Sequence, residues 1–361
     1  MPNYTLRSTS RRVLLALGIV VAFFVFCGGT AQALPVFAHR YGLTCQQCHT
    51  TVPHLTPFGE YFRNHGFALP GARGVFPVAV KVNLAYSSGA DPTGLPKAVV
   101  DEIELLSGGT LGRATNYFVE QYIVDGGRPG LTRDAWVQFQ SGATRAKVGQ
   151  FELPLPVEVE SERPTLTHYA LYDQTVGINA FNFFDPRLGA DVSFANERSG
   201  IAAHLAAVHA YDRQTATPRS GVDVLASVAK SSGEFTVQAY RYQGQRNFAV
   251  QDRFWRQGYA ASFEDERFSV TGVLQTGDDS SADGLGTAAH SSGGFLETQY
   301  HFSPAFGAVA RYEGTADSLS GTQRQFVLGA VARPRRNMRL TAEDVLVAGH
   351  HTLGAGLLFA Y

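Results

Sequence analysis

From about Val75 to the end of the chain, apolar and polar residues alternate in segments of roughly ten residues, which is the length with which a tilted strand crosses a membrane. In Ala305–Gly314, for example, Phe306 and Tyr312 fall on one face, while Arg311 and Glu313 fall on the other. A period of two predicts β-strands. Beyond residue 33 no run is long and apolar enough for a membrane-spanning helix.

The connections between these segments alternate between long and short along the chain. Long links are expected near 87–97, 125–132, 153–187, 211–220, 243–252, 277–292 and 314–322. Short links are expected at Ser107–Arg113, Ser141–Arg145, Ala195–Gly200, Lys230–Glu234, Glu264–Arg267, Phe302–Ala305 and Arg333–Met338, with a last tight link at Ala348–His351. This predicts about sixteen antiparallel strands with the long links on one rim, the asymmetry of transmembrane barrels in bacterial outer membranes. A secreted β-sandwich has no reason to separate link lengths so regularly.

Two of the long links carry features of their own. The stretch 153–187 resembles the third loop region of phosphate-selective and related porins, which folds into the lumen, although a proline-broken surface loop is an equal interpretation. The link Gly277–Asp283 gathers Asp278, Asp279 and Asp283. Carboxylates of this kind suit a cation such as Fe(II), but such a run is usually a solvated loop.

The N-terminus has the pattern of a secretory signal peptide. Arg7, Arg11 and Arg12 precede an apolar run, and Ala31-Gln32-Ala33 offers a cleavage site. We therefore expect three parts: a signal peptide at 1–33, a short segment at 34–74 and the barrel at 75–361. Removal of the three arginines takes the formal net charge from −1 to −4. No basic stripe is present, so we expect no nucleic-acid partner.

The run Cys45-Gln46-Gln47-Cys48-His49 is the attachment signature of a c-type haem. Cys45 and Cys48 are spaced to form one thioether each to the haem vinyl groups, and His49 then ligates the iron as proximal ligand. A zinc site needs a second pair of ligands, and no other cysteine remains after Ala33. A thioredoxin-type motif needs a βαβ context, which is absent from the predicted strands. We therefore expect one covalent haem c.

The candidates for the second axial ligand of the iron can be reduced by elimination. Met338 is the only methionine beyond residue 33, and it falls at a turn far along the barrel. His65, His54 and His39 remain as distal candidates. His65 ranks first because the chain between it and His49 is long enough to fold back over the haem, whereas His54 is close to His49. An iron with no distal protein ligand is the alternative.

The segment from Leu34 to about Arg73 is too short to build an independent core around a haem. A sixteen-stranded barrel has a lumen wide enough to take a plug. We therefore predict that the haem segment lies inside the barrel or on its periplasmic side.

The haem segment resembles the monohaem cytochrome–porin fusions of the outer membrane, whose best-known members are iron oxidases. The resemblance rests on F-A-H-R-Y-G-L-T-C-Q-Q-C-H from Phe37 to His49, P-H-L-T-P-F-G from Pro53 to Gly59, and F-R-N-H-G-F from Phe62 to Phe67. It covers Pro35–Phe67 and is architectural only over the barrel. His39 stands where these proteins usually have arginine, and His65 fills a commonly polar position.

The resemblance implies an electron-transfer protein that connects an extracellular donor, with Fe(II) as one candidate, or acceptor to a periplasmic c-type cytochrome or cupredoxin across the lipid outer membrane. If Fe(II) is the donor, the protein is formally an oxidoreductase. A diffusion porin with a haem-containing redox gate or sensor is the competing hypothesis. A soluble periplasmic cytochrome with a β-sandwich partner is what remains if no barrel forms.

Overall fold

The computed structural model describes residues 36–51, 54–65, 67, 69, 78–90, 96–156, 163–196, 198–212, 217–335 and 337–360. The predicted signal peptide at 1–33 lies outside the described residues. None of the helices in this described part of the chain is long and apolar enough to cross a membrane.

Antiparallel strands dominate the structure from Val78 onward. They are β3 (Val78–Ala90), β4 (Pro96–Gly112), β5 (Thr115–Asp125), β6 (Arg128–Pro129), β7 (Thr132–Ser141), β8 (Thr144–Phe151), β9 (Arg187–Asn196), β10 (Ile201–Asp212), β11 (Thr217–Ser232), β12 (Phe235–Arg246), β13 (Asp252–Glu264), β14 (Phe268–Asp279), β15 (Ala289–Ser303), β16 (Phe306–Asp317), β17 (Gly321–Arg335), β18 (Met338–Val347) and β19 (His350–Ala360).

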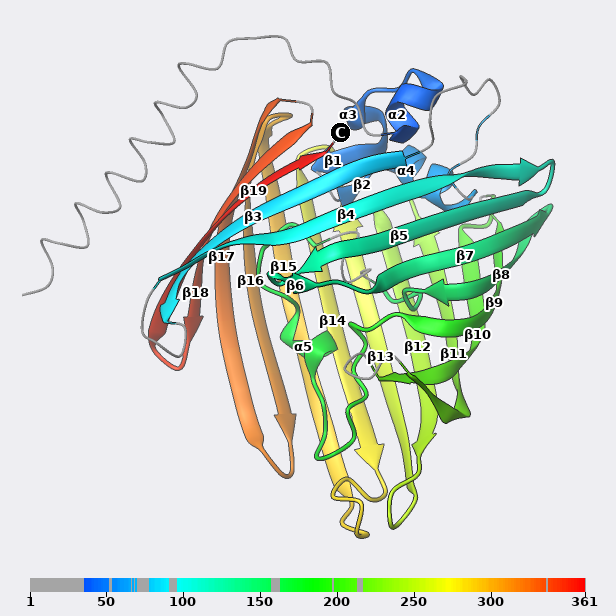
Figure 1. Cartoon of the computed structure of the whole chain (residues 1–361), viewed down its shortest axis with the longest axis vertical. Coiled ribbons are helices and arrows are strands. Elements are labelled where there is room, and N and C mark those ends of the chain that lie inside the picture. Colours follow the sequence, from blue (N-terminus) through cyan, green and yellow to red (C-terminus); the bar gives the residue numbers. More distant parts are fainter. Residues whose placement is uncertain are drawn as a thin grey trace, which may run out of the picture. The chain divides into compact units, whose positions relative to one another are not determined.

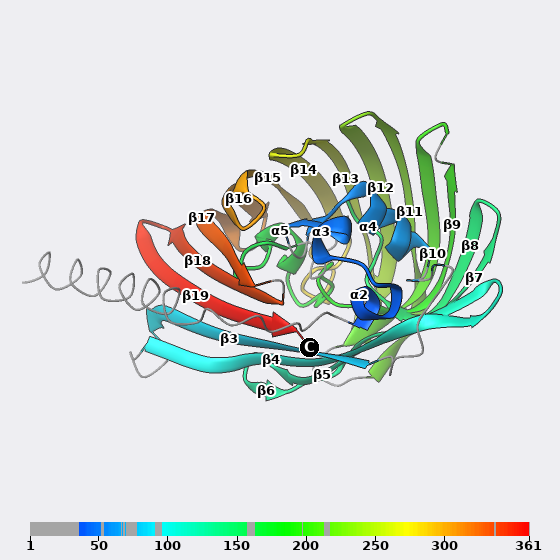
Figure 2. The same ribbon diagram turned by 90° about the horizontal axis from the view of Figure 1, so that it is seen from above.

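Sixteen of these strands form a closed barrel, and the two-residue β6 pairs with β5 at its edge. Each strand pairs with the next one along the chain, and the last strand, β19, closes the ring on β3 with Ala360 opposite Lys81. Figures 1 and 2 show the ring of tilted strands from the side and from above. The prediction of an all-β barrel with about sixteen strands is confirmed.

The alternation of long and short connections is confirmed in part, with two corrections. The expected long link 314–322 is wrong, because β16 runs to Asp317 and β17 begins at Gly321, which leaves only residues 318–320 between them. The expected short link Ser107–Arg113 is wrong in its bounds, because β4 continues through Gly112 and only Arg113–Ala114 turns the chain. Gly108 and Gly109, which fall within the expected link, lie inside β4 instead.

The alternation along each strand separates an outer from an inner face. In β16, Phe306 and Tyr312 are exposed on the outside, while Arg311 and Glu313 are buried inside the barrel. In β14, Leu274 is 70% exposed and Gln275 is buried. An apolar outer band around a polar interior is the arrangement that a barrel in lipid needs.

The N-terminal segment contains short helices and one small sheet. The helices are α2 (Val36–Tyr41), α3 (Cys45–Cys48) and α4 (Pro57–Asn64), and β1 (His49–Thr51) pairs with β2 (His54–Leu55). One further helix, α5 (Ala170–Asp173), belongs to the long connection between β8 and β9.

A charged residue placed on the outer face of the barrel tests whether the apolar outer band lies in lipid. We expect Leu274→Arg to lower the free energy of unfolding in lipid vesicles by about 2–4 kcal/mol, because arginine is costly near the midplane of a bilayer. Leu285→Arg is the matched control, since Leu285 is 75% exposed but lies in the connection between β14 and β15. Urea titrations of both variants measure the difference, and equal effects would contradict a transmembrane barrel.

Candidate functional site

The Cys-x-x-Cys turn is held against helix α4. Cys45–Cys48 forms α3, and the backbone oxygen of Cys48 accepts a hydrogen bond from the backbone N–H of Thr56 at 2.9 Å. The Thr56 hydroxyl donates to the oxygen of Gln47 at 2.6 Å and also caps α4 by accepting from the N–H of Gly59. The turn and the start of α4 are therefore one unit.

Gly59 is required for this close contact. A Cβ atom on Gly59 would lie 2.0 Å from the oxygen of Cys48, a distance that no side chain tolerates. Glycine alone allows two backbones to approach so closely. The Pro-x-x-x-x-Phe-Gly motif that followed the cysteines in the sequence therefore has a structural meaning, which is to place α4 directly on the Cys-x-x-Cys turn.

Helix α4 has one buried and one uncovered aromatic face. Phe62 is 4% exposed and packs edge-on against Phe37. Phe58 lies one turn before Phe62 but is 37% exposed, and the neighbouring Tyr61 is 40% exposed. His65 follows Tyr61 by one helical turn. An uncovered aromatic face beside the Cys-x-x-Cys turn is the kind of surface against which a flat porphyrin packs.

His65 ends this face in a defined orientation. Its ring stacks on Tyr61 with 3.8 Å between centroids, and its Nδ1 lies 2.6 Å from the backbone oxygen of Tyr61. If Nδ1 carries the proton in that contact, Nε2 carries the lone pair. Histidines that bind metal through Nε2 commonly donate Nδ1–H to a backbone carbonyl in this way.

The other predicted haem residues are placed by their backbones only. The side chains of Cys45, His49, His54 and His39 lie outside the described part of the structure, so the thioether, proximal and remaining distal assignments stay predictions. Cys48 is half-buried. Phe62 and Phe67 pack as core aromatics.

The N-terminal segment contacts the inner wall of the barrel at β4, β5 and β7. The ring of Phe67 lies 4.8 Å from that of Phe118 and 6.4 Å from that of Trp136. Arg40 donates from Nη1 to the oxygen of Gly108 at 3.1 Å. Seen from above, α2, α3 and α4 lie within the ring of strands (Figure 2).

The two glycines of β4 make room for this contact. A Cβ on Gly108 would lie 2.9 Å from the ring of Phe37, and a Cβ on Gly109 would lie 2.2 Å from the guanidinium of Arg40. This role of the two glycines was not predicted from the sequence. The available signal was a pair of glycines inside a strand pattern, which marks a close approach of another part of the chain as often as a turn.

The long connection between β8 and β9 also contacts the inner wall. It folds into the barrel, which agrees with the inward-folded loop and not with the surface loop of the two interpretations given for 153–187. Arg311 on β16 is fully buried between Glu297, at 3.3 Å, and Glu313, at 2.9 Å. It also donates to the backbone oxygens of Thr167 at 2.8 Å and His168 at 2.9 Å. This Arg311 clamp joins the connection to the wall.

Other wall carboxylates hold the same connection. Glu343 on β18 accepts from the N–H of Leu166 at 2.8 Å, and Glu313 accepts from the N–H of Ala170 at 2.7 Å. Farther along, the buried side chain of Asn179 donates to Asp252 and Asp279, each at 2.9 Å. The connection is thus tied to the wall at several points rather than lying on the surface.

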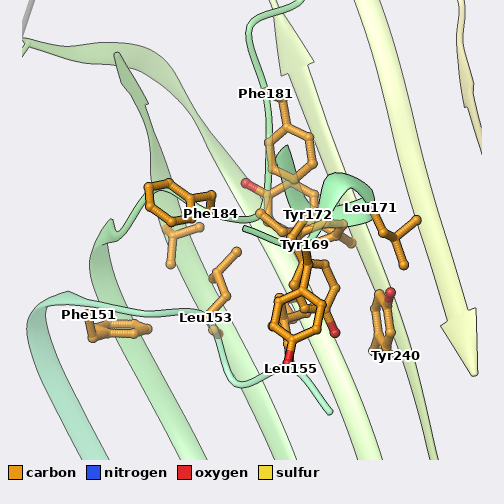
Figure 3. Packing of buried hydrophobic residues seen from close by; sticks show 14 of the residues in the cluster. Phe151, Leu153, Leu155, Tyr169, Leu171, Tyr172, Phe181, Phe184 and Tyr240 are labelled. Carbon is orange, nitrogen blue, oxygen red and sulfur yellow. The ribbon is translucent and has the colours of Figure 1, made fainter. Parts of the chain in front are cut away.

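Aromatic and aliphatic side chains fill the space between the connection and the wall. Figure 3 shows the cluster in which side chains of the connection meet Tyr240 of β12. Its members from the connection and the end of β8 are Phe151, Leu153, Leu155, Tyr169, Leu171, Tyr172, Phe181, Phe183 and Phe184. Phe118 and Trp136, which contact the N-terminal segment, belong to the same cluster. The barrel interior at this level is a packed core.

The acidic loop does not assemble a metal site. Asp278 pairs with His290 at 3.0 Å, and Asp279 pairs with Arg256 at 2.8 Å. Asp283 accepts from the Thr287 hydroxyl and from two backbone N–H groups, and these hydrogen bonds lower its pKa to about 2. Among the described residues no group of three or more histidine, cysteine or acidic side chains is arranged to hold a metal.

Comparison with solved structures identifies the barrel as porin-like. The anion-selective porin from Comamonas acidovorans aligns with a TM-score of 0.61 and 14% identity over 79% of this chain and 98% of that chain. OmpF from Salmonella typhi, solved in complex with daunomycin, aligns with a TM-score of 0.61 and 12% identity over 79% and 97%. The channel DcaP of Acinetobacter baumannii aligns with a TM-score of 0.58 and 9% identity over 79% and 96%.

At these identities the likeness shows the fold alone. No protein-family model matches the chain, and no curated protein matches it in sequence.

Adding a methyl group at Gly59 tests the contact between α4 and the Cys-x-x-Cys turn. If haem attaches at Cys45 and Cys48 as predicted, we expect Gly59→Ala to reduce the haem per folded barrel severalfold, because its Cβ collides with the backbone of Cys48. Gly112→Ala is the control, since nothing lies within 4 Å of a Cβ there. Haem-stained gels with total protein as reference measure the ratio, and equal haem content in both variants would refute the role of Gly59.

Removing the Arg311 clamp tests whether the connection closes the barrel. We expect Arg311→Ala to lower the free energy of unfolding by about 3–5 kcal/mol, because Glu297 and Glu313 lose their buried cation. The freed connection should also raise the single-channel conductance in planar bilayers. Arg198→Ala, at an exposed site in the turn between β9 and β10, should change neither quantity. A conductance unchanged by Arg311→Ala would show that the clamp does not close the barrel.

Proposed function

We propose that this chain is an outer-membrane cytochrome–porin that moves electrons between an extracellular donor and a periplasmic carrier through one covalent haem c. The observation that carries the proposal is the Cys-x-x-Cys-His turn seated on α4, whose uncovered aromatic face ends at His65. Bound haem supplies one-electron chemistry, and the protein supplies its binding and orientation.

The residues present fit such a group. Cys45 and Cys48 would anchor the haem by thioethers, and His49 would be the proximal ligand. His65 is the favoured distal ligand, because the contact between its Nδ1 and Tyr61 suits a metal-binding tautomer. His54 and His39 are the remaining candidates. Phe58 and Tyr61 offer apolar surface next to the turn.

The barrel has two roles in this proposal. Its apolar outer band places it in the lipid outer membrane, and its closed sheet insulates the interior. The inward connection, packed on the wall through its aromatic side chains (Figure 3), occupies part of the lumen. Contacts of Phe37, Arg40 and Phe67 with β4, β5 and β7 support a haem segment inside the barrel or on its periplasmic side.

The proposed partners follow from this placement. Fe(II) is one candidate for the extracellular donor, which would make the protein an oxidoreductase, and a c-type cytochrome or cupredoxin is the candidate carrier in the periplasm. Electron flow in the opposite direction, to an extracellular acceptor, uses the same parts.

A diffusion porin with a haem-containing gate or sensor is the second candidate. The structural likeness to an anion-selective porin and to other outer-membrane channels favours it. In that case the inward connection would narrow a water-filled pore rather than close it.

Rapid mixing with Fe(II) tests electron entry. We expect the oxidised, detergent-folded protein to develop reduced haem bands in stopped-flow visible absorption after mixing with Fe(II). Cys45→Ser/Cys48→Ser should fold as a barrel, judged by heat-modifiable gel migration, yet carry no covalent haem. A haem that dithionite reduces but Fe(II) does not would remove iron as donor.

Conductance separates the two candidates. An electron conduit with a packed interior should be nearly closed in planar bilayers in both redox states. A pore whose conductance is porin-sized and changes on haem reduction would support the gated porin instead.

A further inference from the structure

The backbone of His65 is held from the barrel wall. The side-chain amide of Asn116 on β5 donates to the oxygen of His65 at 3.0 Å, although the two residues are 51 positions apart. Asn116 is 5% exposed and stands between Thr110 of β4 and Gln138 of β7 in the register of the sheet. A buried amide in the interior of a barrel strand therefore points at one backbone atom of the N-terminal segment.

The chain directly after His65 is fixed as well. Phe67 has a φ of 57°, a left-handed conformation that is uncommon for a bulky residue. Its N–H donates to the oxygen of Phe62 at 2.9 Å, its own oxygen accepts from the Tyr41 hydroxyl at 3.2 Å, and its ring packs on Phe118. Such a conformation persists only where the surroundings determine it. The chain after α4 is thus set by contacts within the N-terminal segment and by the ring contact with Phe118 of the wall.

Two contacts fix His65, the candidate distal ligand, one through its ring and one through its backbone. The Tyr61 carbonyl orients the imidazole ring through Nδ1, and Asn116 fixes the backbone that carries it. Mutation of a residue that holds a metal ligand in its orientation typically costs about 10–100-fold in metal affinity or activity.

We propose that Asn116 is a positioning residue for the haem, through which the barrel wall fixes His65 as distal ligand. This inference rests on the proposed function, because it requires covalent haem at Cys45 and Cys48. It makes the barrel part of the haem site, so that the coordination of the iron depends on a strand far from the Cys-x-x-Cys-His motif.

The experiment uses the full chain, folded in detergent with its haem. Asn116→Ala removes the donor, and Asn116→Asp keeps the size of the side chain but replaces its N–H₂ by an acceptor. Asn83→Ala is the matched control, because Asn83 is 6% exposed in β3 and its amide donates to Glu102. The readouts are the high-spin fraction of the ferric haem by electron paramagnetic resonance and the rate of imidazole binding to it.

We expect Asn116→Ala and Asn116→Asp to raise the high-spin fraction and to speed imidazole binding roughly tenfold, as His65→Ala does more strongly. Asn83→Ala should match the wild type. If Asn116→Ala does not fold, Asn116→Asp alone decides. Wild-type behaviour of the folded Asn116 variants overturns the inference, as does a His65→Ala variant with an unchanged spectrum. Absence of covalent haem from the wild-type protein refutes the proposed function itself, which is a distinct result.

Discussion

Closure of the sheet is the constraint on which the rest of the structure depends. A strand edge with unpaired N–H and C=O groups is not tolerated in lipid, so a β-sheet can span a membrane only as a closed ring. Pairing of β19 with β3 meets this requirement. Closure also assigns every second residue to the interior, which is why Arg311 and Glu313 face inward while Tyr312 between them faces out. Buried charges then need partners, and the connection between β8 and β9 supplies several of them.

The parts of the structure that follow from local periodicity were predictable. Alternation of Phe306, Tyr312, Arg311 and Glu313 indicated a strand with two different faces, and the alternating link lengths indicated antiparallel neighbours with two unlike rims. Both inferences use only spacing along the chain. Each strand pairs with the next one in sequence, so the spacing of residues and links fixes which side chains face inward and which links share a rim. The Cys-x-x-Cys-His motif is local in the same sense, and the haem that it indicates remains a prediction on which the proposed function rests.

The contacts that join distant segments were not predictable. Nothing near Arg311 in the sequence indicates that it binds backbone oxygens at residues 167 and 168. The amide of Asn116 is one of many polar groups expected on an inner face, and its specific partner emerges only from the fold. The expected link Ser107–Arg113 includes Gly108 and Gly109, and glycine inside a strand has the same local signature whether it bends the strand or admits a neighbouring segment. In each case the deciding interaction lies between residues far apart in the chain.

The docking of the N-terminal segment on β4, β5 and β7 has a consequence for the order of assembly. Its described wall partners lie on β4, β5 and β7, early in the sequence of the barrel, whereas the ring closes only when the last strand, β19, pairs with β3. The segment can therefore seat on a partial sheet while one side is still open. Closing the ring afterwards would enclose the folded segment without threading it through a finished barrel mouth.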